Sequence, residues 1–324
     1  MHQIEKLREI INREIEKMNF AGRQPGELYL PVDYIMSNGG KRLRPVITLM
    51  ACELFSDNLS PGIKPAVAIE LFHNFTLLHD DIMDKSDMRR SQPTVHKKWG
   101  ENTAILSGDV MVVISFDLIS SAGKKILPHL LSVFNKTAIQ VCEGQQMDMN
   151  FETADSVEEE TYMEMIKLKT SVLIAAAMQI GAIAGGASEK DAGLMYECGI
   201  NLGLAFQLQD DLLDLYGEEK EFGKKSGGDI LMNKKTFLLV KAFEKATDKT
   251  AGRIKYLMEK EDNPDIKVNE MKRIFDELDI KSITGNKAAY FFNNSLEKLW
   301  KTSPPKERKS ELAGFIQAVM KRKS

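Results

Sequence analysis

The sequence predicts an all-α protein, and three observations lead to this prediction. Apolar residues recur at intervals of three and four along most of the chain, whereas alternation at period two is nowhere sustained. All 10 prolines lie near expected helix starts or loops. With 324 residues and 43% hydrophobic content, the chain can bury a large core, as one large domain or two.

The expected helices follow the apolar period from one end of the chain to the other. The first is amphipathic with charges of both signs, which is unlike a signal peptide. The helix expected from 157 is preceded by Ser156, a suitable cap, and carries carboxylates in its first turn. The full set covers 2–20, 31–38, 43–56, 63–85, 93–99, 102–121, 129–151, 157–187, 189–216, 234–246, 248–260, 265–278, 286–302 and 306–322.

Two stretches differ in composition from the rest of the chain. Residues 170–188 carry no charge and are long enough to span a membrane. Their glutamine, their glycines and the missing aromatic belt favour a buried central helix instead, so we expect no integral membrane protein. Residues 217–233 form the one long Gly- and Lys-rich interruption, which predicts a mobile loop. From 240 to 324 the sequence is more polar, and we expect a supporting C-terminal helical region there.

Charge and cysteine content exclude several classes of protein. The formal net charge of −3 provides no basic field for nucleic acid. Cys52, Cys142 and Cys198 are scattered and lack CxxC spacing, which argues against a disulfide framework and against a zinc knuckle. This cysteine usage fits a reducing compartment, and we expect a cytoplasmic protein.

An acidic cluster ends the apolar helix expected at 63–85. Asp80, Asp81 and Asp84 follow a run of apolar residues and share a sector of roughly 100° on one helix face. Carboxylates gathered in this way repel one another unless a cation joins them. Oxygen-only ligands favour a hard divalent ion, and Mg²⁺ is the usual one when phosphate completes the shell.

The same spacing recurs at the end of a second apolar run, as Asp210, Asp211 and Asp214. One such cluster by itself is most simply a solvated helix face. Two identical clusters, each after a long apolar stretch, favour a pair of metal sites. We expect the two to face one another across a metal-bound diphosphate.

Basic side chains accompany both acidic clusters. Any one of them is by itself most simply a surface charge. Together with the carboxylates they indicate two anionic groups, one held through metal and one bound directly, and diphosphates suit both roles. The uncharged stretch behind them indicates that the rest of the ligand is hydrocarbon. The basic residues are Lys41, Arg42, Arg44, Arg89, Arg90, Lys167, Lys169, Lys224, Lys225, Lys234 and Lys235.

Six motifs occur in an order that resembles the trans-isoprenyl diphosphate synthases, also called polyprenyl synthases, over about 35–240. They are GGKRLRP, LLHDDIMD with two arginines, CEGQQMD, KLKT, FQLQDDLLD and GKKSGGDILMNKKT. The resemblance implies a single-domain helical bundle around a deep central cavity, and a homodimer. It implies head-to-tail condensation of an allylic diphosphate with isopentenyl diphosphate.

The resemblance also implies roles for the residues of these motifs. Mg²⁺, about three ions per active site, would be held chiefly by Asp80, Asp84 and Asp210, with the other three aspartates as ligands or acceptors behind them. The allylic diphosphate would contact Arg89, Lys169, Lys224 and Lys234. The cation left after its departure would be stabilised by the oxygens of Thr170 and Gln207.

Isopentenyl diphosphate, by the same resemblance, would be held by Lys41, Arg44, His73 and Arg90. His73 alone would be read as a core histidine. Its position two turns before Asp80 on the same helix face favours ligand binding instead.

The length of the product depends on the floor of the hydrocarbon tunnel. Phe75 lies about 7.5 Å behind Asp80 along a straight helix, with the small Thr76 beside it. An aromatic residue at this position resembles short-chain family members, so we expect a trans C15 or C20 product, with C20 favoured. Ser91 departs from the family's usual glycine, and a modest change of loop geometry is expected there.

The sequence also leaves other functions open. A medium- or long-chain synthase shares every motif. A class I terpene cyclase shares the first acidic cluster but needs neither GGKRLRP nor the second cluster. A non-catalytic subunit of a heteromeric synthase usually lacks one cluster, and both are intact here. A di-iron bundle is suggested by the ExxH pair of Glu70 and His73, but no second pair occurs.

Overall fold

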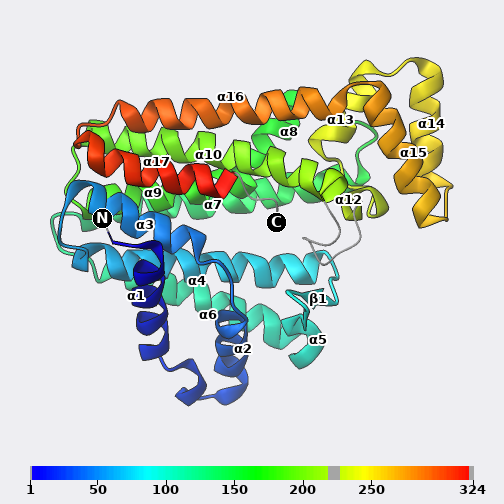
Figure 1. The fold of residues 1–324 in the computed structure, drawn as a ribbon. Coiled ribbons are helices and arrows are strands. Elements are labelled where there is room, and N and C mark those ends of the chain that lie inside the picture. The colour runs from blue at the N-terminus through cyan, green and yellow to red at the C-terminus, as the bar shows by residue number, and fades with distance from the viewer. Residues whose placement is uncertain (1, 218–226, 321–324) are drawn as a thin grey trace. The chain divides into compact units, whose positions relative to one another are not determined.

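The computed structural model describes residues 2–217 and 227–320, and it confirms the all-α prediction (Figure 1). Its elements are α1 (Ile4–Lys17), η1 (Phe20–Gly22), α2 (Gly26–Ser37), α3 (Leu43–Phe55), α4 (Ser60–Met83), β1 (Met88–Arg89), β2 (Gln92–Pro93), α5 (Val95–Trp99), α6 (Glu101–Ser120), α7 (Leu127–Thr153), α8 (Glu159–Ile166), η2 (Lys167–Ser171), α9 (Val172–Ala184), α10 (Glu189–Tyr216), α12 (Gly228–Leu231), α13 (Phe237–Lys245), α14 (Asp248–Glu259), α15 (Pro264–Glu277), α16 (Ile280–Trp300) and α17 (Lys306–Met320).

The chain divides into two compact units, each built from several chain segments. Unit 1 comprises Met1–Lys136, Ala176–Tyr196 and Thr302–Leu312. Unit 2 comprises Thr137–Ala175, Glu197–Lys301 and Ala313–Ser324. Helices α7, α9, α10 and α17 contribute residues to both units. The prediction of a single domain stays a prediction.

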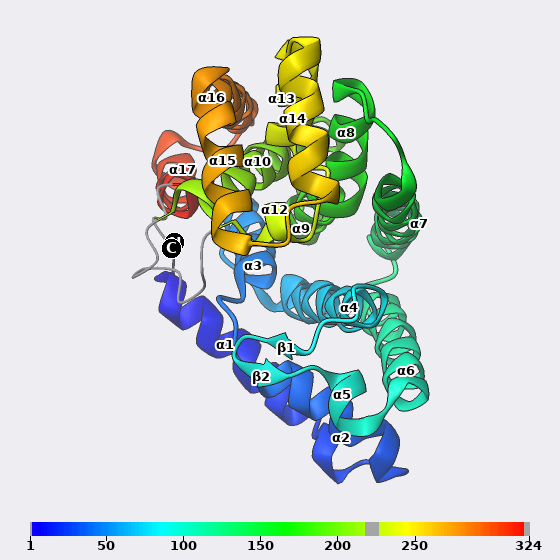
Figure 2. The same ribbon diagram turned by 90° about the vertical axis from the view of Figure 1, so that its right-hand side faces the viewer.

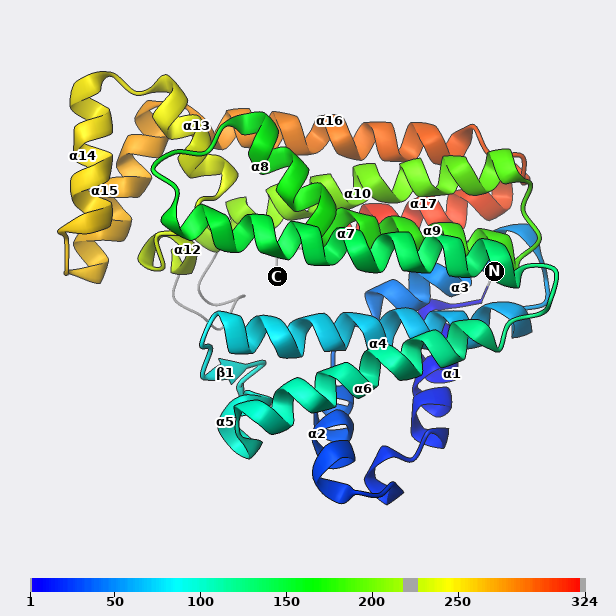
Figure 3. The ribbon, with the colours of Figure 1, turned by 180° about the vertical axis from the view of Figure 1, so that it is seen from behind.

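Unit 1 is organised around α4, which packs along α6 and against α3 (Figures 1 and 3). Most of α4 is apolar on every side, so it is buried by neighbours all round rather than along one stripe. Four aromatic rings contact one another in turn inside this unit, in tilted or edge-to-face pairs with centroid separations of 5.0–5.3 Å: Phe75, Phe72, Phe134 and Phe116.

Unit 2 contains two apolar clusters. The first joins α10 to the helices that follow it, and α14 and α15 lie side by side there (Figure 2). The second gathers residues of α7, α8, α10, α13 and α16 around Tyr162, Leu208 and Phe237. Glu159 on α8 ties these helices together, because Lys241 of α13 and Lys287 of α16 both donate to its carboxylate.

Three helices begin at least three residues earlier than the sequence predicts. Helix α2 begins at Gly26 and α4 at Ser60, so Pro31 and Pro65 lie inside helices instead of marking their starts. Each proline sits within the first two turns, where the loss of one backbone donor is tolerated once the ring is buried. Helix α16 begins at Ile280, six residues before the expected start.

A short hairpin that the sequence did not predict follows the first acidic cluster. Strands β1 and β2 pair antiparallel, with Arg89 opposite Gln92. The two turn residues, Arg90 and Ser91, have φ values of 52° and 61°. Both lie in the left-handed region, as in the turns that match the twist of a hairpin. Ser91 therefore has a backbone conformation that favours glycine. Under this condition the sequence predicts that serine costs more free energy than glycine would.

The helix expected over 157–187 is interrupted where its functional motif lies. Residues 167–171 form a π-helical turn, η2, between α8 and α9. Such turns are rare and frequently occur at functional sites. Glycines of two neighbouring helices allow close approach: a Cβ on Gly144 of α7 would lie 2.3 Å from the backbone nitrogen of Lys169, and one on Gly203 of α10 would lie 2.4 Å from the Cα of Ser171.

Two helical stretches within the described residues are long and apolar enough to cross a membrane, α6 and Glu159–Ala184. The second contains the uncharged segment, and every residue from 172 to 178 is 3% exposed or less. The prediction of a buried central helix there is confirmed. Helix α6 is different, because only 33% of its apolar window is buried.

The predicted mobile loop at 217–233 falls largely outside the described residues, since 218–226 are not described. Lys224 and Lys225 lie in that part, so their predicted roles stay predictions. Residues after 227 form the short helix α12. The region from 240 to 320 is helical, as predicted.

Candidate active site

The first acidic cluster lies at the end of α4, with Asp84 as the C-cap residue. Asp81 is 3% exposed, and both of its carboxylate oxygens lie 2.8 Å from Nε of Arg89. Arg89 also reaches Asp80, with 3.7 Å between Nη2 and Oδ2. Burial raises the pKa of Asp81, and the Arg89 guanidinium opposes that shift. Asp81 therefore serves as the anchor of Arg89 in this structure.

The predicted isopentenyl diphosphate residues gather around one loop of unit 1. Arg44 Nη1 lies 3.0 Å from His73 Nε2, which joins the start of α3 to α4. Arg90 donates a hydrogen bond to the carbonyl of Gly39. Burial and the charge of Arg44 hold the pKa of His73 well below its ordinary value. The ring is therefore neutral at pH 7 and accepts a hydrogen bond from Arg44.

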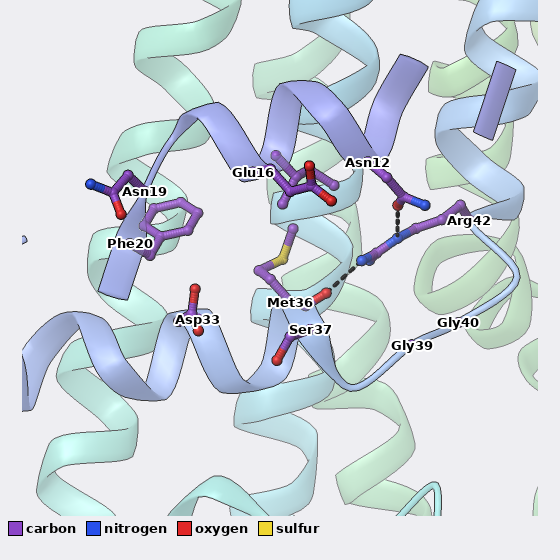
Figure 4. A pocket seen from close by; sticks show the side chains of 11 residues that line it. Asn12, Glu16, Asn19, Phe20, Asp33, Met36, Ser37, Gly39, Gly40 and Arg42 are labelled. Carbon is purple, nitrogen blue, oxygen red and sulfur yellow. Dashed lines mark hydrogen bonds between the residues drawn. The ribbon is translucent and has the colours of Figure 1, made fainter. Parts of the chain in front are cut away.

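Arg42 and Glu70 form a buried ion pair that sequence reasoning missed. Arg42 has φ = 47°, and its side chain is 7% exposed. Its Nη1 lies 2.8 Å from Oε1 of Glu70. Its Nε donates to Asn12, and its Nη2 donates to the carbonyl of Met36 (Figure 4). The signal was a lone glutamate inside an apolar helix, since a buried charge needs a partner.

A pocket of about 320 Å³ adjoins this ion pair and is lined by residues of α1, α2 and the Gly39–Gly40 turn (Figure 4). Arg42 closes one end of it. We call the contacts of Arg42 with Glu70, Asn12 and Met36 the Arg42 clamp. Lys41, the residue before Arg42, is exposed, and Arg44, two residues after it, is half-buried. The Arg42 clamp thereby fixes the loop that carries both residues.

Phe75 is held between two rings of its own helix. Its centroid lies 5.3 Å from that of Phe72 and 4.7 Å from that of His79. The His79 ring in turn fits against Gly108 of α6, where an added Cβ would lie 2.2 Å from Nε2. Thr76 donates its hydroxyl to the carbonyl of His73 at 2.7 Å. The ring of Phe75 therefore has little freedom to turn aside.

The second acidic cluster lies near the end of α10, in unit 2. Asp211 is 5% exposed and accepts three hydrogen bonds, from the hydroxyl of Tyr162 at 2.6 Å, from Gln207 Nε2 at 3.0 Å and from the backbone of Phe237 at 3.2 Å. Burial raises the pKa of Asp211 to about 6. Asp214 accepts the backbone N–H of Asp229 at 3.0 Å.

A small pocket of about 70 Å³ joins this cluster to the π-helical turn. Lys169 lies on its wall and forms a 2.6 Å ion pair with Asp148 of the CEGQQMD motif. Thr170 donates its hydroxyl to Oε1 of Gln207 at 3.1 Å. Lys234 also lines the pocket, 3.9 Å from the carboxylate of Asp229. The structure thus brings Lys169, Thr170, Gln207, Asp211 and Lys234 together, and Asp148 is an addition that sequence reasoning did not single out.

The predicted metal ligands lie in two separate acidic clusters. Among residues 2–217 and 227–320, no three His, Cys, Asp or Glu side chains gather closely enough to hold an ion. Mg²⁺ is commonly held by one or two carboxylates with substrate phosphates and water, and Asp80 and Asp84 suit such a site in unit 1. In unit 2, Asp210 suits a site of the same kind. Asp81 and Asp211 fit the role of acceptors behind the ligands, because both oxygens of each already accept hydrogen bonds. As the two clusters belong to different units, the expectation that they face one another stays a prediction.

Comparison with known proteins identifies the family. Residues 25–278 match the sequence model of the family described as polyprenyl synthetase. A geranylgeranyl diphosphate synthase of Methanosarcina mazei is 46% identical over 68% of this chain and 69% of its own. A geranylgeranyl pyrophosphate synthase of Geoglobus acetivorans is 42% identical over 74% of this chain and 75% of its own.

A solved structure agrees with these relatives. The crystal structure of a geranylgeranyl pyrophosphate synthase matches with a TM-score of 0.93 at 43% identity and covers 100% of both chains. A match of this extent includes all six motifs. The chain therefore belongs to the polyprenyl synthetase family and is a prenyltransferase.

Proposed function

We propose that the protein condenses isopentenyl diphosphate with an allylic diphosphate, head to tail, and releases a trans C15 to C20 prenyl diphosphate, with C20 favoured. One observation carries this proposal: besides an acidic cluster, unit 1 holds a separate group of nitrogen donors that suits a second diphosphate. Arg44, His73 and Arg90 meet at the loop that also carries Lys41. A cyclase, which takes a single diphosphate, has no use for such a group.

The aspartates would hold Mg²⁺ against the allylic diphosphate. Asp80, Asp84 and Asp210 are the proposed ligands, with about three ions per active site. The bound ions supply charge neutralisation on the leaving group as the C–O bond breaks. Lys169 and Lys234 of unit 2, and Arg89, which pairs with Asp81 in unit 1, are the further proposed contacts of this diphosphate.

The reaction then proceeds without a covalent enzyme intermediate. The allylic C–O bond breaks, and the double bond of isopentenyl diphosphate attacks the resulting cation to form one new C–C bond. The oxygens of Thr170 and Gln207 stabilise the cation in a site that excludes water. A proton leaves the condensed cation for the departed diphosphate, which restores an allylic double bond.

A product assay tests the proposal directly. Purified protein is supplied with isopentenyl diphosphate and dimethylallyl or farnesyl diphosphate, with and without Mg²⁺, and the products are separated by chromatography. We expect a C20 diphosphate that requires Mg²⁺. A cyclic hydrocarbon would establish a cyclase, an absence of product would establish a non-catalytic subunit, and a main product of C40 or longer would place the chain among long-chain synthases.

Two substitutions test the proposed tunnel floor in opposite directions. Phe75→Ala removes a ring held by Phe72 and His79, so it is expected to lengthen the products. Thr76→Phe adds a ring on the next position of α4 and is expected to shift the products toward C15. If both variants give the wild-type distribution, the floor lies elsewhere.

We further propose a homodimer in the cytoplasm that is neither an integral membrane protein nor a nucleic-acid-binding one. Helix α6 exposes Ile105, Leu106 and Val113 by 40%, 58% and 65%. An exposed apolar stripe of this kind marks an interaction surface. Sedimentation equilibrium is expected to show a dimer, and Leu106→Glu combined with Val113→Glu is expected to yield monomers. A wild-type monomer would contradict the proposal.

A further inference from the structure

Three hydrogen bonds connect the buried phenol of Tyr162 to the hydroxyl of Thr170 through Asp211 and Gln207, and a fourth joins Asp211 to the backbone of Phe237. Tyr162 on α8 and the backbone of Phe237 donate to Oδ2 of Asp211, at 2.6 and 3.2 Å. Gln207 Nε2 donates to Oδ1 of the same carboxylate at 3.0 Å. Thr170 on the π-helical turn donates to Oε1 of Gln207 at 3.1 Å. All of these groups belong to unit 2.

The direction of each bond follows from the chemistry of the groups. An ionised carboxylate has no hydrogen, so Asp211 can only accept. The amide of Gln207 must therefore turn its NH₂ toward Asp211 and its oxygen toward Thr170. The hydroxyl hydrogen of Thr170 and one N–H of Gln207 are then engaged, and oxygen lone pairs of Thr170 and Gln207 remain for a ligand in the adjoining pocket.

We propose that Tyr162 and Asp211 are positioning residues that fix the orientation of the Gln207 amide, so that Gln207 and Thr170 turn their oxygens toward the allylic cation. This inference rests on the proposed function. A positive centre is stabilised by oxygen lone pairs and destabilised by N–H groups that point at it. A reversed amide would place its NH₂ at Thr170 and present hydrogens where the cation forms.

The geometry favours this role for Asp211 over metal ligation. Asp211 is 5% exposed, and Tyr162 is 2% exposed. Three protein donors already occupy the carboxylate of Asp211, so about one of its four lone-pair positions remains for a metal. The hydroxyl of Tyr162 donates its hydrogen to Asp211, so we expect its effect on the reaction to pass through that carboxylate.

A matched pair of Tyr→Phe variants tests the proposal. Tyr162→Phe removes the hydroxyl that donates to Asp211. Tyr216→Phe is the control, because the hydroxyl of Tyr216, near the end of α10, donates to Asp276 at 2.8 Å and takes no part in the hydrogen bonds from Tyr162 to Thr170. We expect Tyr162→Phe to lower kcat about tenfold, the effect of losing one hydrogen bond to a charged group, with both KM values within about twofold. The control is expected to keep wild-type kinetics.

The outcomes separate the inference from the proposed function. If the wild-type protein does not condense the two diphosphates, both fail. If it does, and Tyr162→Phe has the kcat of Tyr216→Phe, only the inference fails. A Tyr162→Phe variant that raises KM while kcat stays at the wild-type value would also overturn it.

An exchange of functional groups provides a second test that a structural role alone does not pass. In Asp211→Asn, Tyr162 and Phe237 hold the oxygen of the introduced amide, so its NH₂ group faces Gln207 and forces the Gln207 amide to reverse. We expect kcat to fall about a hundredfold. Adding Gln207→Glu restores an acceptor on both sides, because the carboxylate introduced by this second substitution accepts from the new NH₂ group and from Thr170. The net charge of the double variant equals that of the wild type.

The double variant is therefore expected to recover at least about tenfold in kcat over Asp211→Asn alone. Thermal unfolding of both variants is measured in parallel, and circular dichroism establishes that each is helical. If Asp211 acts as a metal ligand or merely as a structural group, the carboxylate is needed at position 211 itself. The double variant then remains as inactive as Asp211→Asn, and that result would overturn the proposal.

Discussion

Replacing Gly144 with alanine probes how closely α7 approaches the π-helical turn. The added Cβ would lie 2.3 Å from the nitrogen of Lys169 and 2.6 Å from the carbonyl carbon of Leu168, about 1 Å short of ordinary contact. These neighbours are backbone atoms, so one of the two elements must move. Overpacking costs about 1–3 kcal/mol, and the better helix propensity of alanine returns up to about 1 kcal/mol. We expect a net loss of about 1–2 kcal/mol in the free energy of unfolding.

The larger effect is expected on catalysis, because Lys169 and Thr170 lie on the turn that must move. A displacement of 1 Å at reacting groups costs about a hundredfold in rate. Urea denaturation and initial-rate kinetics measure the two effects separately. Gly252→Ala is the control: Gly252 lies inside α14 with no atom near the added Cβ, and it is expected to gain about 0.5–1 kcal/mol with unchanged kcat. A Gly144→Ala variant with wild-type kcat would refute the reasoning.

Three further predictions concern other contacts. Arg42→Met combined with Glu70→Leu removes both buried charges, so we expect a free energy of unfolding within about 1 kcal/mol of wild type. The KM for isopentenyl diphosphate is expected to rise roughly tenfold, because the loop that carries Lys41 and Arg44 is no longer fixed. Equal changes in the KM values of both substrates would contradict the role of the Arg42 clamp. Partial burial alone would raise the pKa of Glu159, but hydrogen bonds from its two lysine partners lower it. The ionised Glu159 therefore stabilises the folded protein fully above about pH 5, and this contribution is lost as the pH falls through the lowered pKa. The stability difference between wild type and Glu159→Gln, measured by urea denaturation, should therefore be constant from about pH 5 to 8 and shrink below about pH 4. Ser91→Gly should raise the free energy of unfolding by about 0.5–1 kcal/mol, because the residue has φ = 61°, and an unchanged value would contradict the strain.

The fold class was predictable because helix periodicity is a local property. Apolar residues spaced three and four apart determine which face of each helix is buried, wherever its neighbours lie. Boundaries at Pro31 and Pro65 were predicted less well. A proline inside a helix removes one backbone hydrogen bond, so it is typical of a helix boundary. Both rings are buried inside helices in the structure, and their burial is decided by other elements of the fold.

The candidate site shows the same division. Charge, spacing and motif order predicted Asp80, Asp84, Arg44, His73, Lys169, Thr170 and Gln207, because their chemical groups are recognisable in the sequence. The supporting partners were not predicted. Arg42 and Glu70 are 28 positions apart, and Tyr162 lies 49 positions from Asp211, so no local pattern connects them.

The sequence by itself determined the helices, the oxygen and nitrogen groups available for catalysis, and the uncharged stretch that becomes a buried helix. The tertiary structure decided what each group does. Asp81 and Asp211 occupy equivalent positions in two identical motifs, yet one pairs with Arg89 and the other accepts from Tyr162, Gln207 and Phe237. The physical reason is that the energy of a charge depends on its neighbours and its exposure to water, and folding alone brings those neighbours to it.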